Sequence, residues 1–137
     1  MKYIGLDLGS VTCGVAISDS SGIIARVYTT LRYTKDSYPY AAKKVIEICN
    51  KEEVVNVVLG NPKHMNGDEG IRSNISKEFK KLLENDTNLK VVLWDERLSS
   101  VTVNNAMLSG NLSRQKRRQK KDELAAVVIL QGYLDFK

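Results

Sequence analysis

Three groups of carboxylates in this sequence are candidates for binding a divalent metal ion. Asp7 lies in the apolar run Tyr3-Ile4-Gly5-Leu6-Asp7-Leu8-Gly9, which is typical of a buried strand. A solitary ionised acid in such a strand is costly to desolvate unless it is paired or bound to a cation. Two acid pairs, Asp95-Glu96 and Asp122-Glu123, also stand at the ends of apolar segments. The hypothesis to test is that all three groups meet at one metal.

Converging carboxylates suit phosphodiester chemistry. Mg²⁺ prefers carboxylate, water and phosphate oxygens as ligands. Two such ions about 3.5–4 Å apart can activate an attacking water and stabilise the leaving oxygen. Asp7, Glu96 and Asp122 would supply the negative charge from two strand ends and the start of a helix.

Each acid also has a purely structural interpretation. Asp122 and Glu123 would be stabilised by the helix dipole if they occupy a first helical turn. Asp95 and Glu96 could form a surface turn with Arg97, and Asp7 could be hydrogen-bonded to a neighbouring loop. Asp7 is the hardest to explain in this way, because nothing about a buried strand favours an acid.

A cluster of cations immediately precedes Asp122. The segment 114–121 carries six positive charges and no acid, whereas the whole chain has a net charge of +5, so the remainder of the chain carries −1. Such a local patch favours contact with a phosphate backbone, although charged runs are often only solvated surface. We expect the segment to hold the substrate backbone beside the acids, with six contributing residues: Arg114, Lys116, Arg117, Arg118, Lys120 and Lys121.

Length and composition suit one compact domain over residues 1–137, with 42% of the residues hydrophobic. No run approaches the roughly 20 apolar residues of a membrane span, and Asp7 interrupts what would be a signal sequence. Cys13 and Cys49 form no CxxC pair and are expected to be buried thiols, so a cytoplasmic location is expected. His64 is the only histidine, which excludes a zinc site built from histidines.

Periodicity predicts the element order β-β-β-α-β-α-β-α-α. Short connections between the first three strands indicate an antiparallel meander, and the later alternation indicates parallel strands with helices on the sheet faces. The fold class is therefore α/β, with a mixed sheet of five strands. The strands are expected at 2–8, 13–18, 23–30, 54–59 and 91–94, and the helices at 38–50, 71–83, 99–108 and 122–136.

Sites in open α/β sheets form beyond the carboxyl ends of the parallel strands. Asp7 would end the first strand and Asp95-Glu96 the last, so these acids can be neighbours if the two strands lie close. Gly5 and Gly9 on either side of Asp7 leave room for another backbone or a ligand. A similar glycine-rich opening binds ATP phosphates in actin-like and sugar-kinase ATPases, but those proteins need a second domain that this chain is too short to contain.

Several segments together resemble the YqgF/RuvX family. The resemblance spans almost the whole chain in order, and it rests on Gly5-Leu6-Asp7-Leu8-Gly9-Ser10, Gly14-Val15-Ala16-Ile17-Ser18-Asp19, Val57-Val58-Leu59-Gly60-Asn61-Pro62, Asp95-Glu96-Arg97-Leu98-Ser99-Ser100 and Ala125-Ala126-Val127-Val128-Ile129-Leu130-Gln131-Gly132-Tyr133-Leu134. The sequence departs from the family pattern at Val11-Thr12, where the family often has a basic residue, and at Asn61, where it commonly has an apolar one.

The resemblance implies an RNase H-like fold and a nuclease dependent on Mg²⁺ or Mn²⁺, with Asp7, Glu96 and Asp122 as catalytic metal ligands. It implies action in 5′-end maturation of pre-16S rRNA, or alternatively on Holliday junctions in DNA. Arg97 and the basic segment would contact the nucleic acid, and phosphate contacts alone do not distinguish RNA from DNA. The protein would act without a membrane, as a monomer or homodimer.

An alternative function and a possible role for four tyrosines remain open at this point. A non-catalytic RNA-binding factor for ribosome assembly could keep the same fold. Four tyrosines near the third strand could stack on unpaired bases, although a half-buried structural role fits them better: Tyr28, Tyr33, Tyr38 and Tyr40.

Overall fold

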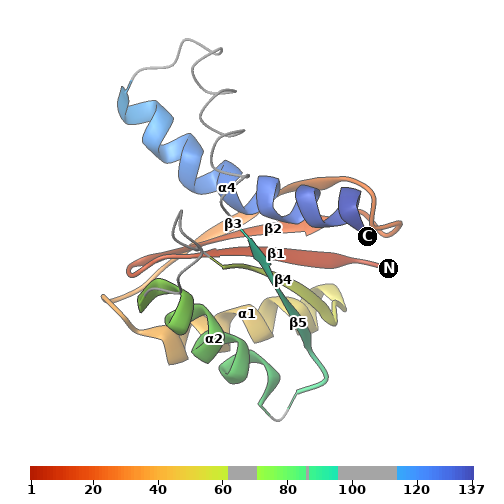
Figure 1. Cartoon of the computed structure of the whole chain (residues 1–137), viewed down its shortest axis with the longest axis horizontal. Coiled ribbons are helices and arrows are strands. Elements are labelled where there is room, and N and C mark those ends of the chain that lie inside the picture. Colours follow the sequence, from red (N-terminus) through yellow and green to blue (C-terminus); the bar gives the residue numbers. More distant parts are fainter. Residues whose placement is uncertain (62–70, 86, 96–113) are drawn as a thin grey trace.

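A five-stranded mixed sheet is the centre of the molecule in a computed structural model of the chain (Figure 1). The structure describes residues 1–61, 71–85, 87–95 and 114–137, with side chains described for all of these except 71–73, 95 and 114–123. The strands are β1 (Tyr3–Leu8), β2 (Thr12–Ser18), β3 (Ala25–Arg32), β4 (Asn56–Asn61) and β5 (Lys90–Asp95), and the helices are α1 (Tyr38–Glu52), α2 (Ile71–Glu84) and α4 (Arg114–Phe136).

The strand order is β3-β2-β1-β4-β5. The first three strands pair antiparallel, whereas β1 pairs with β4 and β4 with β5 in parallel, as the sequence predicts. Strand β4 therefore separates β1 from β5, although the carboxyl ends of all three lie at one edge of the sheet. The predicted helix over 99–108, His64, Glu96 and Arg97 lie outside the described residues.

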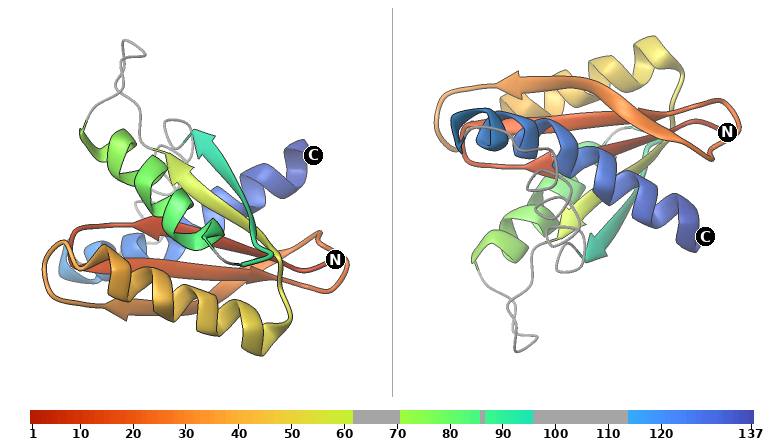
Figure 2. Two further views of the ribbon diagram at one scale, coloured as in Figure 1. Left: turned by 90° about the horizontal axis from the view of Figure 1, so that it is seen from below. Right: turned by 90° about the horizontal axis from the view of Figure 1, so that it is seen from above.

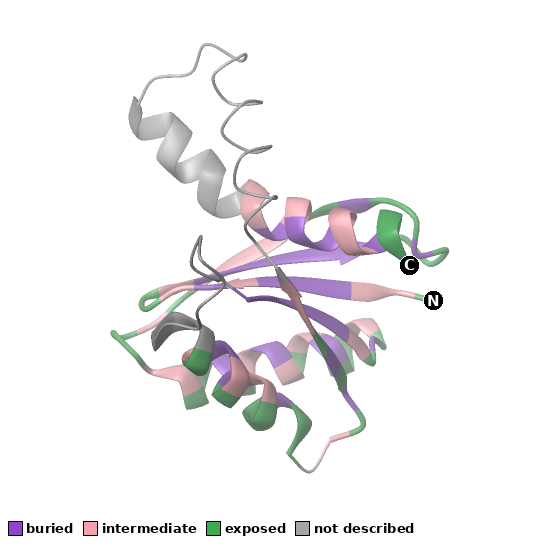
Figure 3. Cartoon of the chain, viewed as in Figure 1, coloured by how far each residue is buried: buried purple, intermediate pink, exposed green. Residues whose placement is uncertain are grey.

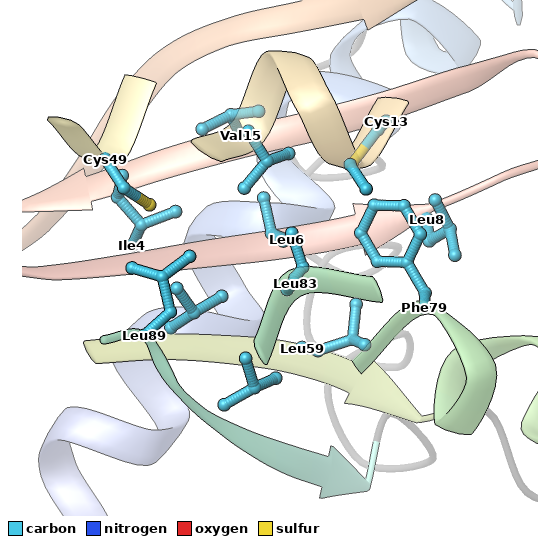
Figure 4. Packing of buried hydrophobic residues seen from close by; sticks show 14 of the residues in the cluster. Ile4, Leu6, Leu8, Cys13, Val15, Cys49, Leu59, Phe79, Leu83 and Leu89 are labelled. Carbon is cyan, nitrogen blue, oxygen red and sulfur yellow. The ribbon is translucent and has the colours of Figure 1, made fainter. Parts of the chain in front are cut away.

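Helices cover the two faces of the sheet unequally (Figure 2). One face packs against α1 and α2 and holds the larger core (Figure 4). Ile4, Leu6 and Leu8 of β1 point into this core, and Phe79 of α2 is completely buried there. Cys13 and Cys49 are buried in the same core as free thiols, which confirms their predicted burial.

Of the described helices, only α4 packs against the other face. Ala126, Ile129, Leu130 and Leu134 form a buried stripe on this helix, at the spacing that one helix face requires (Figure 3). Within the described part of the chain, no helix is both long enough and apolar enough to cross a membrane.

Helix α4 begins earlier than the sequence analysis predicted. It runs without interruption from Arg114 to Phe136, so the basic segment forms its first turns rather than a loop before it. Asp122 consequently lies in the interior of the helix, not in its first turn, and stabilisation by the helix dipole no longer explains an acid there. The uninterrupted stretch of helix-compatible Arg, Lys and Gln residues accounts for the longer helix.

Close contact at Gly5 sets the distance between α4 and the sheet. A Cβ atom at Gly5 would lie 2.6 Å from the Leu130 Cβ and 3.0 Å from the Ala126 carbonyl oxygen. Any side chain at this position would therefore push against the helix backbone. Because Gly5 is on β1, directly before the Leu6-Asp7 dipeptide, the same contact fixes the height of α4 above the strand that carries Asp7.

We expect Gly5→Ala to lower the free energy of unfolding by about 1–3 kcal/mol, the usual cost of overpacking, in urea denaturation. Gly132→Ala is the matched control. Its new methyl group would meet the side chain of Trp94, at 3.2 Å from Nε1, and Ala favours a helix over Gly by about 1 kcal/mol. This control should therefore lose less stability than Gly5→Ala. Equal stability of Gly5→Ala and the wild type would show that α4 does not rest on Gly5.

Candidate active site

Asp7 points to the sheet face that α4 covers. Its neighbours Leu6 and Leu8 are buried in the opposite core, and side chains alternate along a strand. Gly5, two residues earlier, faces Ala126 and Leu130 of α4. Asp7 itself is half-buried rather than fully buried, so its carboxylate keeps access to solvent, contrary to the burial expected from the apolar run.

Glycine stands beside Asp7 on both neighbouring strands. In the antiparallel register Asp7 is opposite Gly14 of β2. In the parallel register Leu6 is opposite Leu59, so Gly60 follows on β4 at the level of Asp7. Residues side by side on adjacent strands place their Cβ atoms about 5 Å apart, so a larger residue at either position would crowd the carboxylate. Neither glycine places a side chain beside the Asp7 carboxylate.

The row continues to Trp94 on β5, because Gly60 pairs with Trp94 in the parallel register. The backbones of Asp7 and Trp94 are separated by two strand spacings, each of about 4.8 Å. Sequence reasoning treated Gly60 as a strand end and gave Gly14 little weight. The signal that identifies both is a glycine within a strand pattern, which often marks a close approach of a ligand or backbone.

The turn after Asp7 is held by a network of hydrogen bonds from residues 33–36. Gly9 N donates to the Thr12 carbonyl at 2.7 Å, which closes the turn. The Tyr33 hydroxyl lies 2.5 Å from the Gly9 carbonyl oxygen and 2.9 Å from that of Thr12. Backbone donation from Tyr33 to Val11 at 3.0 Å and from Asp36 to Ser10 at 2.8 Å adds two more links. The turn is therefore a fixed end for the strand that carries Asp7.

A basic side chain stands next to this turn. Arg32 of β3 pairs with Thr12 and is exposed. Leu31 packs against the core on the α1 side, so Arg32 faces the side of Asp7. It offers a cation where Val11-Thr12 leaves the turn without one, and the sequence analysis did not identify it.

The Cys13 thiol takes no part in the site. Burial raises its pKa, and the negative charge of the nearby Asp7 raises it further. A thiol with such a raised pKa stays protonated at neutral pH and is neither a nucleophile nor a metal ligand.

The placement of the other predicted site residues is only partly described. Glu96 and Arg97 lie outside the described residues, and the side chains of Asp122 and of the basic segment are not described. The helical period places position 122 one turn before Ala126, which is buried against the sheet beside Gly5. Among the side chains that the structure describes, no group of three His, Cys, Asp or Glu residues could hold a metal ion.

Comparison with known proteins identifies the family. Residues 1–136 match the RuvX family, described as Holliday junction resolvase, and the chain belongs to this family. A relative from Geobacillus sp. (strain WCH70), named as a candidate pre-16S rRNA nuclease, is 45% identical over 137 residues, which is 100% of this chain and 99% of the relative.

Two solved structures share the fold. Thermus thermophilus RuvC in complex with a Holliday junction substrate superposes with a TM-score of 0.62 at 12% identity, over 99% of this chain and 96% of that one. Fowlpox virus resolvase with its Holliday junction DNA gives a TM-score of 0.57 at 17% identity, over 99% and 98% of the two chains. The predicted RNase H-like mixed sheet is therefore confirmed.

Removing the Tyr33 hydroxyl tests the turn. We expect Tyr33→Phe to lower the free energy of unfolding by about 1–2 kcal/mol and to speed amide exchange at Gly9, because two carbonyls lose a partly buried donor. Tyr38→Phe serves as the control, since its hydroxyl donates to the exposed Asp36 carboxylate. Unchanged exchange at Gly9 in Tyr33→Phe would contradict the proposed restraint.

Proposed function

We propose that this protein is a metal-dependent nuclease for structured nucleic acid, acting in 5′-end maturation of pre-16S rRNA. The observation that carries the proposal is the position of Asp7: a half-exposed carboxylate between two glycines, at the carboxyl edge of parallel strands. Membership of the RuvX family and the name of the Geobacillus relative support it.

The donor chemistry at Asp7 suits a hard cation. A carboxylate is a preferred Mg²⁺ ligand, and Mn²⁺ accepts the same oxygen donors. We propose that Asp7, Glu96 and Asp122 hold one or two metal ions. When bound, the metal supplies activation of the attacking water and stabilisation of the leaving oxygen.

The remaining work falls to side chains of this chain. Asp7, held in place by the pairing of β1 and by the hydrogen-bonded turn that follows it, would hold the ion beside which the reacting phosphate binds. Arg32 would contact a neighbouring phosphate in place of the basic residue missing from Val11-Thr12. Arg97 and the basic first turns of α4 would hold the backbone further along. We assign all of this to a single RNase H-like domain over 1–137, working in the cytoplasm as a monomer or homodimer.

A Holliday junction resolvase is the second candidate function. The resolvase activity ascribed to the RuvX family favours it, as do the two structures with the same fold, which are resolvases bound to Holliday junctions. A resolvase would prefer four-way DNA to structured RNA and act as a dimer. A ribosome-assembly factor, the third alternative, would bind RNA without cleaving it.

Replacing the central carboxylate separates these functions. With purified pre-16S rRNA and a synthetic four-way DNA junction side by side, we expect Mg²⁺- or Mn²⁺-dependent cleavage of the RNA. Asp7→Asn should abolish cleavage and preserve binding, since the amide keeps the shape but loses the charge that holds the ion.

Asp36→Asn is a matched control for this substitution. Asp36 is exposed, lies beside the same turn and has a positive φ of 62° that Asn also tolerates, so cleavage should continue at the wild-type rate. Preferential cleavage of the junction would support the resolvase. A failure to cleave either substrate with either metal would contradict the nuclease proposal.

Two arginines of β3 test the phosphate contact. Both are exposed, but Arg32 is next to the turn after Asp7, whereas Arg26 pairs with Ile17 toward the opposite end of the strand. Arg32→Ala should weaken RNA binding and lower the slope of log K against log salt by about one, while Arg26→Ala should change neither. Identical salt slopes for the two variants would remove Arg32 from the interface.

A further inference from the structure

A strip of aromatic side chains lies on the α4 side of the sheet, along β5. The aromatic strip consists of Trp94 on β5 with Tyr133 and Phe136 on α4. The ring centroids of Trp94 and Tyr133 are 5.8 Å apart in an edge-on arrangement, and those of Trp94 and Phe136 are 5.3 Å apart. Phe136 exposes 75% of its surface, and Val92, two residues before Trp94 on the same face, exposes 38%.

The fold builds this strip through a second glycine contact. Trp94 reaches α4 at Gly132, where an added Cβ would lie 3.2 Å from the indole nitrogen. The ring of Tyr3 packs against that of Tyr133, at a centroid distance of 5.9 Å. Packing between sheet and helix thus explains Tyr3, Tyr133 and one side of Trp94. It does not explain Phe136, because an aromatic ring left largely in water gains little from burial.

Charged side chains lie near the end of α4 and on β5. Asp135 accepts a hydrogen bond from Gln131 at 2.9 Å, and Gln131 in turn bonds the backbone of Ile23 and Ala25 on the β3 side. The Lys137 ammonium lies 5.1 Å from the centre of the Tyr3 ring, which packs against Tyr133 of the strip. Lys90 is exposed on β5 and, by strand alternation, faces the same side as Trp94. Cations therefore border the aromatic strip, which suits an anionic ligand.

The strip is also continuous with the candidate active site. Trp94 occupies the same row as Asp7, with only Gly60 between them, and all three face α4. The tyrosines that the sequence suggests for base stacking do not lie on this face of the sheet. Tyr28, Tyr33 and Tyr38 pack against the core on the opposite face, beside α1.

We propose that the aromatic strip stacks unpaired nucleobases of a single-stranded segment next to the phosphate bound at the proposed metal site of Asp7. The inference rests on the proposed function and extends it to a preference for substrates with a single-stranded flank. Aromatic rings stack on any base, and flanking lysines meet the backbone, which together are the features of single-strand binding surfaces. An apolar protein partner would leave the bordering cations unused.

Trp94 is the only tryptophan in the chain, so its fluorescence reports on the strip directly. The experiment titrates the full chain in EDTA with a short oligouridine RNA and with a blunt RNA duplex, following tryptophan emission and the anisotropy of a labelled oligomer. EDTA prevents cleavage, so the readout is binding alone. We expect saturable quenching by the single strand and none by the duplex.

Phe136→Ala is the decisive variant, because its exposed side chain can be removed without opening the core. It should weaken binding of the single strand by about fivefold or more, the lower end of base–aromatic stacking. Tyr40→Ala is the matched control: Tyr40 is 49% exposed and has Lys44 at 5.5 Å over its ring, but it lies on α1 at the opposite face. Its affinity should equal that of the wild type.

The outcomes distinguish this inference from the proposed function. The single strand could bind, as measured by anisotropy, without changing Trp94 emission and with equal affinity for Phe136→Ala. That result would overturn base stacking on the strip and would leave the nuclease proposal intact. A dimer that Phe136→Ala converts to a monomer, with RNA binding unaffected, would assign the strip to a contact between two copies and also overturn it. Absence of binding of the single strand in EDTA would also overturn the strip, whereas the proposed function is tested separately, by cleavage with Mg²⁺ or Mn²⁺.

Discussion

The approach of helix α4 to the sheet at Gly5 is the constraint on which the rest of the structure depends. The Leu130 Cβ and the Ala126 carbonyl occupy the space that a side chain at position 5 would need. Because the atoms of α4 that approach Gly5 are backbone atoms and a Cβ atom, the spacing is set by hard contact rather than by side chains that can change rotamer. The same strand then carries Asp7 and the same helix carries position 122, so one contact fixes how far apart these two acids begin.

The two faces of the sheet divide the work of the molecule. The face beneath α1 and α2 holds the larger hydrophobic core, with Phe79 and the alternate residues of β1 completely buried. Among the described helices only α4 packs on the other face, which carries the row from Gly14 through Asp7 and Gly60 to Trp94. A stable core on one side permits small residues and a half-exposed carboxylate on the other.

Much of this arrangement follows from the sequence. The apolar and β-branched runs and the short turns predict the mixed sheet, and the acid in the first strand identifies Asp7 as a candidate. Pairing partners are set by tertiary structure, so the glycines beside Asp7 and the position of Arg32 opposite Thr12 emerge only from the register. The start of α4 was misplaced because a basic run has the propensity for helix but no apolar period to reveal it.

The central claim is that Asp7 ligates a divalent metal on the α4 face of the sheet. A crystal of the protein grown with Mn²⁺ tests it most directly, through an anomalous difference map collected near the manganese absorption edge. The account predicts a peak about 2.1 Å from an Asp7 carboxylate oxygen, on the side of the sheet that faces α4. A map with no peak at Asp7 under saturating Mn²⁺, or with peaks only elsewhere on the molecule, would contradict it.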